Sequence, residues 1–249
     1  MLAVTSAQGL ELFSADRYDE VATLPVFSLG APTGMVASWG SVFVAFGGLA
    51  TESAGTSRTD ASSSVGMGFG NPVKSIGATL SLSIGSVAPD GDMAERGSVG
   101  FSIGKFFVGP QLGVAIGGID VGGWNDITLP RDHSAYIAVT KIIPLDEYPI
   151  IVSLGAGNNA FADVQTIALN PTLNPRKEID AFAAIAFYLT PHINLLVDYT
   201  AGVSSAGTSI APLADVPLVI TLGAYDISKD VPGHTSVSFT GSIAYAFRF

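Results

Sequence analysis

The clearest pattern of hydrophobic and polar positions lies at the end of the chain, in residues 237–249. Every second side chain there is large and apolar, apart from one glycine, and the side chains between them are mostly small or polar. The large ones are Val237, Phe239, Ile243, Tyr245, Phe247 and Phe249. Successive side chains of a strand point to opposite faces, so the pattern predicts a β-strand with one apolar face and one small, polar face.

The same period of two recurs upstream. It is cleanest in residues 76–84, 99–104, 112–117 and 193–200, and shorter in residues 42–46, 65–69, 152–156, 185–189 and 220–224. Two less regular segments, residues 135–143 and 205–212, bring the total to about twelve strands, an even number as bacterial membrane barrels require.

The connections between these segments alternate in length. Short connections carry turn residues such as Pro72, Pro110 and Pro191, and the long, polar ones are residues 51–61, 87–97, 120–133, 158–180, 201–207 and 226–234. Transmembrane barrels have short turns at one end and longer loops at the other. We therefore predict an all-β fold, an antiparallel up-and-down transmembrane β-barrel of about 12 strands, formed by residues 35–249 with both termini at the periplasmic end.

Several aromatic residues fall near that end of the predicted barrel. They are Trp39, Phe106, Phe107, Tyr148, Tyr188, Phe247 and Phe249. Amphipathic rings favour the membrane–water interface, so we expect these residues to form an aromatic girdle.

The composition supports a membrane setting. Hydrophobic residues make up 48% of the chain and charged residues 13%, whereas soluble domains usually have about 25% charged residues. Every apolar run is too short for a spanning helix, and a closed barrel is the other structure that satisfies its backbone in lipid. A soluble β-sandwich is the main alternative fold. The net charge of −10 argues against a nucleic-acid partner.

Residues 1–34 do not follow the strand pattern. They contain an acidic stretch at residues 16–20 and several prolines and glycines. We interpret them as an N-terminal extension that lies either in the periplasm or in the lumen as a plug. The first residues lack the basic region of a secretory signal, so we expect that a signal sequence has been removed.

The ending Tyr245-Ala-Phe247-Arg-Phe249 resembles the C-terminal signature of Gram-negative outer-membrane β-barrel proteins. In that family the barrel-assembly machinery recognises the terminal aromatic residue and the aromatics that alternate before it. The resemblance implies that Tyr245, Phe247 and Phe249 form an assembly signal and that the protein lies in the lipid of an outer membrane. Residues 39–44 are also similar to uncharacterised barrels of cyanobacteria, a similarity that implies no activity.

The inward face of the predicted barrel consists mainly of Ser, Thr, Gly and Ala, which leaves space for water or a plug. The larger candidates for lumen residues are Gln111, Asn194, Asp198, Tyr225 and Arg248. Asp198 is the one acid in a strand predicted to lie at membrane depth. An unpaired buried carboxylate is costly, so Asp198 should face water or a partner, either as a cation-attracting group or as a structural acid.

The predicted long loops carry more acidic than basic residues. The candidate outer-mouth acids are Asp90, Asp92, Glu95, Asp120, Asp126 and Asp132. Such a field concentrates cations, and Asp90-Gly91-Asp92 is the best candidate fragment for binding calcium at the outer loops. We expect no other cofactor and no metal centre.

Catalysis is not indicated. A lipase-type site needs a serine with a histidine base, but His133, His192 and His234 all fall in predicted loops or turns, where we expect them to be solvated. The glycine-rich segments lack the following helix that a phosphate loop needs. We therefore expect that the protein is not an enzyme.

Two functions remain open at this point. The first is a passive channel for small solutes with a cation-favouring outer mouth. The second is a structural or interaction barrel, plugged by residues 1–34 or by its loops. Its outer loops, mainly residues 158–180, would bind another surface component.

Overall fold

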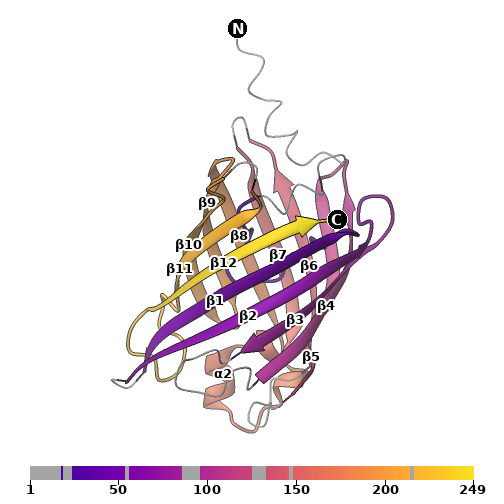
Figure 1. Cartoon of the computed structure of the whole chain (residues 1–249). Coiled ribbons are helices and arrows are strands. Elements are labelled where there is room, and N and C mark those ends of the chain that lie inside the picture. Colours follow the sequence, from indigo (N-terminus) through magenta and orange to yellow (C-terminus); the bar gives the residue numbers. More distant parts are fainter. Residues whose placement is uncertain are drawn as a thin grey trace.

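The computed structural model describes residue 18 and residues 24–53, 56–85, 96–124, 133–145, 148–213 and 216–249. Within these residues, twelve antiparallel strands form a closed barrel (Figure 1). They are β1 (Ser41–Ser53), β2 (Thr56–Gly70), β3 (Gly77–Gly85), β4 (Arg96–Phe107), β5 (Leu112–Trp124), β6 (Ser134–Ile143), β7 (Ile150–Asn158), β8 (Ile179–Thr190), β9 (Ile193–Thr200), β10 (Val203–Ile210), β11 (Leu218–Tyr225) and β12 (Ser238–Arg248). The structure confirms the predicted all-β, up-and-down barrel and excludes the β-sandwich.

Strand β12 closes the barrel against β1. The pairing runs from Ala50 opposite Phe239 to Ser41 opposite Arg248. At the rim, the N–H of Phe249 donates to the carbonyl of Gly40. The last strand predicted from the sequence is therefore the strand that joins the two ends of the sheet.

Side chains alternate between the two faces of the wall as the period of two predicts. The outer face carries a belt of exposed large apolar side chains, among them Phe46, Leu80, Phe101, Ile116, Ile137, Leu154, Ile185, Leu195, Leu222 and Phe239. In β9 the outward residues Leu195 and Val197 are exposed, whereas Leu196 between them is buried. A single register error would exchange the two faces, so this alternation fixes which residues line the lumen.

The connections agree with the predicted alternation of length at every position but two. Residues 51–61 were predicted to be a long outer loop, and this prediction is wrong, because β1 ends at Ser53, β2 begins at Thr56 and these two residues pair with each other. Residues 201–207 were also predicted to be a long outer loop, and this prediction is wrong as well. Ala201 and Gly202 alone form a tight turn, and β10 begins at Val203. Both turn residues have positive φ, 56° and 81°, which is the conformation that two-residue hairpin turns require.

The inner face is more apolar than the sequence pattern predicted. Phe106, Ile142, Ile151, Tyr188 and Leu196 point inward and form a buried cluster. The prediction that Phe106 and Tyr188 belong to the aromatic girdle is therefore wrong, because these side chains are only 1% and 2% exposed.

Four of the other predicted girdle residues are exposed, and two of them, Trp39 and Phe249, are in contact. Trp39 contacts the rings of Phe69 and Phe249, with ring centroids 5.9 and 6.4 Å apart. Phe107 and Phe247 are exposed as well. This exposed group agrees with a girdle at the end of the barrel where the chain ends at Phe249 (Figure 1).

Short helices occupy the connection between β7 and β8, at the end of the barrel opposite the C-terminus (Figure 1). They are η2 (Asn159–Phe161), α2 (Val164–Leu169) and η3 (Pro175–Lys177). Asp163 caps α2, since its Oδ1 accepts from the N–H of Thr166 at 2.6 Å. Among the described helices, none has the length and apolar character needed to cross a membrane.

Candidate functional site

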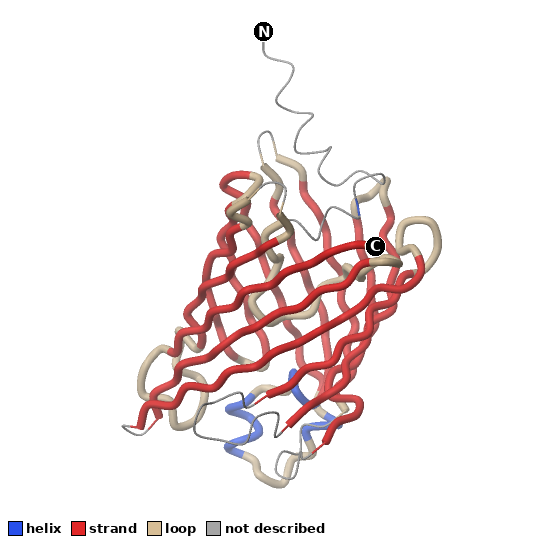
Figure 2. The backbone as a smooth tube through the Cα atoms, in the orientation of Figure 1, coloured by secondary structure: helices blue, strands red, loops and turns tan. Residues whose placement is uncertain are grey.

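Residues 24–38, here called the lumen segment, run inside the barrel before the chain reaches the rim at Trp39 and β1 begins. Figure 2 shows this stretch as an irregular loop between the front and rear walls. An irregular segment has backbone N–H and C=O groups that need partners when they are buried. Those partners are side chains of the barrel wall.

Asp198 makes the most concentrated of these contacts. Its Oδ2 accepts hydrogen bonds from three successive backbone N–H groups, those of Leu29, Gly30 and Ala31, each at 2.9 Å. Three converging N–H groups form a site suited to an anion, and Asp198 is only 3% exposed. The predicted partner of this acid is therefore the lumen segment itself.

Asn194, four residues earlier on the same face of β9, holds the next part of the segment. Its Nδ2 donates to the carbonyl of Val26 at 2.7 Å. The N–H of Val26 donates to Ser209 Oγ at 3.1 Å, and Tyr188 Oη donates to the carbonyl of Pro25 at 2.9 Å. Strands β8, β9 and β10 thus each supply a side chain to these two residues.

The later part of the segment is held by hydroxyl groups. The N–H of Gly34 donates to Thr140 Oγ1 at 2.7 Å, and Thr140 in turn shares a 2.7 Å hydrogen bond with Ser153. The N–H of Ala37 donates to Thr79 Oγ1 at 2.8 Å. The wall therefore satisfies backbone groups at intervals along the segment.

Glycine allows the segment to approach the wall closely. A Cβ atom at Gly34 would lie 2.3 Å from the carbonyl oxygen of Gly113 in β5, and one at Gly113 would lie 2.5 Å from the oxygen of Gly34. A Cβ at Gly68 would similarly meet the oxygen of Ser38 at 2.1 Å. At these positions glycine leaves the space that the segment occupies.

Three other predicted lumen residues lie away from these contacts. Gln111 is in the short turn between β4 and β5, where its N–H donates to Val108 and its carbonyl accepts from Ile142. Tyr225 ends β11 and packs against the cluster of Val164, Ala201 and Val203 at the opposite end of the barrel. Arg248 is exposed at the end of β12. Asn194 and Asp198 are thus the two candidates that the fold brings together.

The opposite end of the lumen is filled by the β7–β8 connection. Phe161 of η2 is buried against Phe182 and Tyr136, with ring centroids 5.0 and 5.8 Å away. Ala31 of the lumen segment belongs to the same apolar cluster. Side chains of the lumen segment and of the β7–β8 connection therefore pack against the same part of the β5–β8 wall.

Most of the predicted outer-mouth acids lie outside the described residues: Asp90, Asp92, Glu95, Asp126 and Asp132. The remaining one, Asp120, lies in β5 toward the end of the barrel opposite the C-terminus, has a φ of 54°, and its carbonyl accepts from the N–H of His133. In the described residues no group of three or more metal-ligating acids or histidines is brought together.

Other acids of this end organise the loops. Asp226 is fully buried, and its carboxylate accepts from the N–H of Asp230 at 2.6 Å and contacts His234 Nδ1 at 2.9 Å. Gln165 Nε2 of α2 donates to Asp230 at 2.9 Å, which joins the β7–β8 and β11–β12 connections. His234 is thus not simply solvated as predicted, whereas His133 and His192 are exposed.

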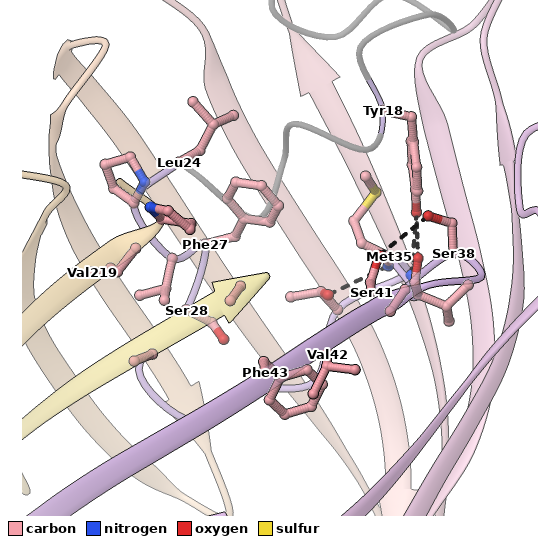
Figure 3. A pocket seen from close by; sticks show the side chains of 18 residues that line it. Tyr18, Leu24, Phe27, Ser28, Met35, Ser38, Ser41, Val42, Phe43 and Val219 are labelled. Atoms are coloured by element: carbon pink, nitrogen blue, oxygen red, sulfur yellow. Dashed lines mark hydrogen bonds between the residues drawn. The ribbon is translucent and has the colours of Figure 1, made fainter. Parts of the chain in front are cut away.

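Free space remains along the wall opposite Asn194 and Asp198. A cavity of about 430 Å³ lies between the lumen segment and strands β1, β11 and β12 (Figure 3). A second cavity of about 240 Å³ lies further along the same wall, lined by Leu29 of the segment and by Gly47, Thr221 and Ser242 of the wall. The segment therefore fills one side of the lumen and leaves the other partly open.

No family model matches the sequence, and no curated protein does. Among solved structures, the barrel is similar to an outer membrane channel from Pseudomonas putida F1, with a TM-score of 0.48 and 9% identity over 88% of this chain and 97% of that chain. It is also similar to the translocator domain of the autotransporter NalP from Neisseria meningitidis, with a TM-score of 0.38 and 10% identity over 90% and 91%. At these scores and identities, neither neighbour assigns a function to this chain.

Proposed function

We propose that this protein is an outer-membrane β-barrel that works as an occluded channel. In the resting state the lumen segment narrows the pore, and conduction requires that segment to shift away from the wall. The observation that carries the proposal is the set of hydrogen bonds from β3, β6, β8, β9 and β10 to the backbone of the segment.

The outer surface supports a membrane location. A continuous belt of exposed apolar side chains surrounds a closed sheet that has no free edge. Such a surface is unfavourable in water and is the surface that a membrane barrel presents to lipid. In this proposal the short turns and both termini face the periplasm, and Tyr245, Phe247 and Phe249 serve as the signal for the barrel-assembly machinery.

The arrangement inside the lumen supports occlusion. Water in an open pore would satisfy the backbone of a loosely placed segment, and no match with wall side chains would be needed. Here the match is detailed, since Asp198 alone orders three consecutive peptide groups and glycines in β2 and β5 leave room for the chain. No residue in this proposal has a catalytic role, and the protein is not expected to be an enzyme.

The test is conductance in planar lipid bilayers. We would replace residues 24–34 by a Gly-Ser linker of the same length, which keeps the chain continuous but removes the apolar side chains that pack in the lumen. It also raises the entropy cost of ordering the backbone groups that bond to Asp198, Asn194 and Thr140. The expected result is a low or silent conductance for the unmodified protein and steady conductance for the linker variant. A Gly-Ser replacement of residues 170–174, which are mostly exposed in the β7–β8 connection, is the control and should conduct like the unmodified protein.

Two results would contradict the proposal. If the unmodified protein conducts as well as the linker variant, the barrel is a passive open channel, and the ion preference at the outer mouth then becomes the relevant measurement. If neither conducts while both show the heat-modifiable mobility of a folded barrel, the lumen segment does not control a pore, and a structural or interaction role is favoured.

A further inference from the structure

The larger lumen cavity has a lining that differs from the polar interior expected of a membrane barrel. From the lumen segment, Leu24, Val26, Phe27 and Met35 face it (Figure 3). From the wall, the residues are chiefly Phe43, Val219, Ala244 and Ala246. None of the described residues that line the cavity carries a formal charge.

The polar side chains in the lining are already engaged within the protein. Tyr18 Oη donates to the carbonyl of Val36 at 2.8 Å, and Ser28 Oγ donates to the carbonyl of Ala31 at 2.6 Å. Thr33 Oγ1 accepts from the N–H of Met35 at 3.3 Å. A ligand rich in hydroxyl groups or charges would lose its hydration here and gain few new hydrogen bonds.

The closing strand explains why space remains at this position. The inward side chains of β12 next to the cavity, Ala244 and Ala246, are small, whereas the inward side chains of the opposite wall include Ile142, Tyr188 and Leu196. The segment packs against the larger side chains and stands off from the smaller ones. The volume of about 430 Å³ falls in the range of roughly 300–1,000 Å³ that is typical of small-molecule sites.

We propose that this cavity is a binding site for a small, uncharged apolar molecule, such as a compact hydrocarbon or a fused aromatic. This inference rests on the proposed function in one respect, namely that the lumen segment is seated in the barrel and forms one wall of the site. The ligand binds between Met35 and Phe27 on the segment and Val219 and Ala246 on the barrel. Apolar surface that water solvates poorly is then covered by the ligand.

Methionine methyl groups provide the measurement, because the chain has 4 methionines in different places. Met35 lines the cavity, whereas Met67 lies opposite Leu80 on the outward face of the wall. We would label the methionine methyl carbons with ¹³C, reconstitute the whole chain in lipid nanodiscs, and titrate with naphthalene as the probe. The expected result is a saturable shift of the Met35 signal, while the Met67 signal changes only in proportion to the naphthalene dissolved in the lipid.

Substitution of the wall tests the location. Ala246→Phe fills the cavity and should abolish the saturable Met35 shift. Ala183→Phe, the same change at a partly exposed position of β8, should leave it intact. If Ala246→Phe does not give a heat-modifiable, folded barrel, Val219→Phe serves the same purpose from β11. A Met35 response that is linear like that of Met67, or a saturable response that persists in the filled variant, overturns the proposal.

Seating of the segment is tested separately, without naphthalene. A Cβ at Gly113 would lie 2.9 Å from Met35 Sδ, so Gly113→Ala should move the Met35 signal if the segment is in place. A Met35 signal that responds to Gly113→Ala but not to naphthalene refutes the ligand site and leaves the occluded channel intact. A Met35 signal that responds to neither shows that the segment is not seated, which refutes both.

Discussion

Asp198→Asn is the most informative single change, because it retains the size of the side chain and removes its charge. In the structure one carboxylate oxygen accepts three backbone hydrogen bonds from Leu29, Gly30 and Ala31. Hydrogen bonds to a charged group contribute about 1.5–3 kcal/mol and neutral ones about 0.5–1.5 kcal/mol, so each of the three loses about 1 kcal/mol. The seated state of the lumen segment is then weakened by about 3 kcal/mol, which corresponds to a change on the order of 100-fold in the ratio of seated to released segment.

The assay is single-channel recording in planar bilayers, with the frequency and duration of openings as the measured quantities. We expect Asp198→Asn to raise steeply the fraction of time for which the channel is open. The size of the increase depends on how small this fraction is in the unmodified protein. Asp60→Asn is the matched control, since Asp60 lies in β2 and lines the smaller lumen cavity, and the substitution removes the same charge from the lumen. If both variants raise conductance equally, the effect comes from lumen charge. If neither does, the hydrogen bonds of Asp198 do not hold the pore closed.

Three further predictions concern the β7–β8 and β11–β12 connections and the closing strand. Phe161→Ala removes a buried ring and should lower the unfolding free energy in detergent by about 3–5 kcal/mol, whereas Leu169→Ala, at a side chain 83% exposed, should leave denaturant unfolding unchanged. Asp226→Asn weakens the contacts that fold the β11–β12 connection around His234, so limited proteolysis should cut this connection faster while the barrel strands stay intact. Deletion of Phe249 should reduce the folded, heat-modifiable fraction in cells far more than after refolding in detergent; an equal loss in both would indicate a stability effect and not a lost assembly signal.

The barrel could be predicted from the sequence because one physical rule, the period of two, repeats in nearly every strand. A closed sheet with lipid on one side and a lumen on the other imposes that period on each strand independently. The predicted length of a connection is wrong where two strands are joined by only two residues. Ala201-Gly202 is such a turn, and the polar residues after it, which suggested a loop, belong to β10.

The contents of the lumen were harder to predict. The need of Asp198 for a partner follows from its position in an apolar strand, but the partner groups lie 167 to 169 residues away in sequence. Neither their spacing nor their residue types mark them, since backbone N–H groups are present at almost every position. A contact of this kind becomes visible only when the fold is known.

A weaker signal for the filled lumen was present in the strands. Ile142-Ile143, Ile150-Ile151 and Leu195-Leu196 are pairs of apolar neighbours, and in a strand such pairs place apolar side chains on both faces. A lumen filled with water would not favour an apolar side chain at the inward-facing position of each pair. Tyr188 also follows from the alternation, because Phe187 and Leu189 on either side of it point outward.

The two sides of the lumen therefore differ: one holds the lumen segment by hydrogen bonds, and the other borders the cavities. From Pro25 to Gly34, the segment bonds to β6, β8, β9 and β10, whose inward faces combine large apolar side chains with Asn194, Asp198 and Thr140. Strands β1, β11 and β12 face the segment across open space and contribute small or apolar side chains. Because the holding groups and the cavity lie on separate walls, a change such as Asp198→Asn can release the segment without altering Ala244 or Ala246, and a change such as Ala246→Phe can fill the cavity without removing a hydrogen bond to the segment. While the segment is seated, the open space therefore lies along the wall that the closing strand provides, and the small inward side chains of β12, Ala244 and Ala246, are what leave it open.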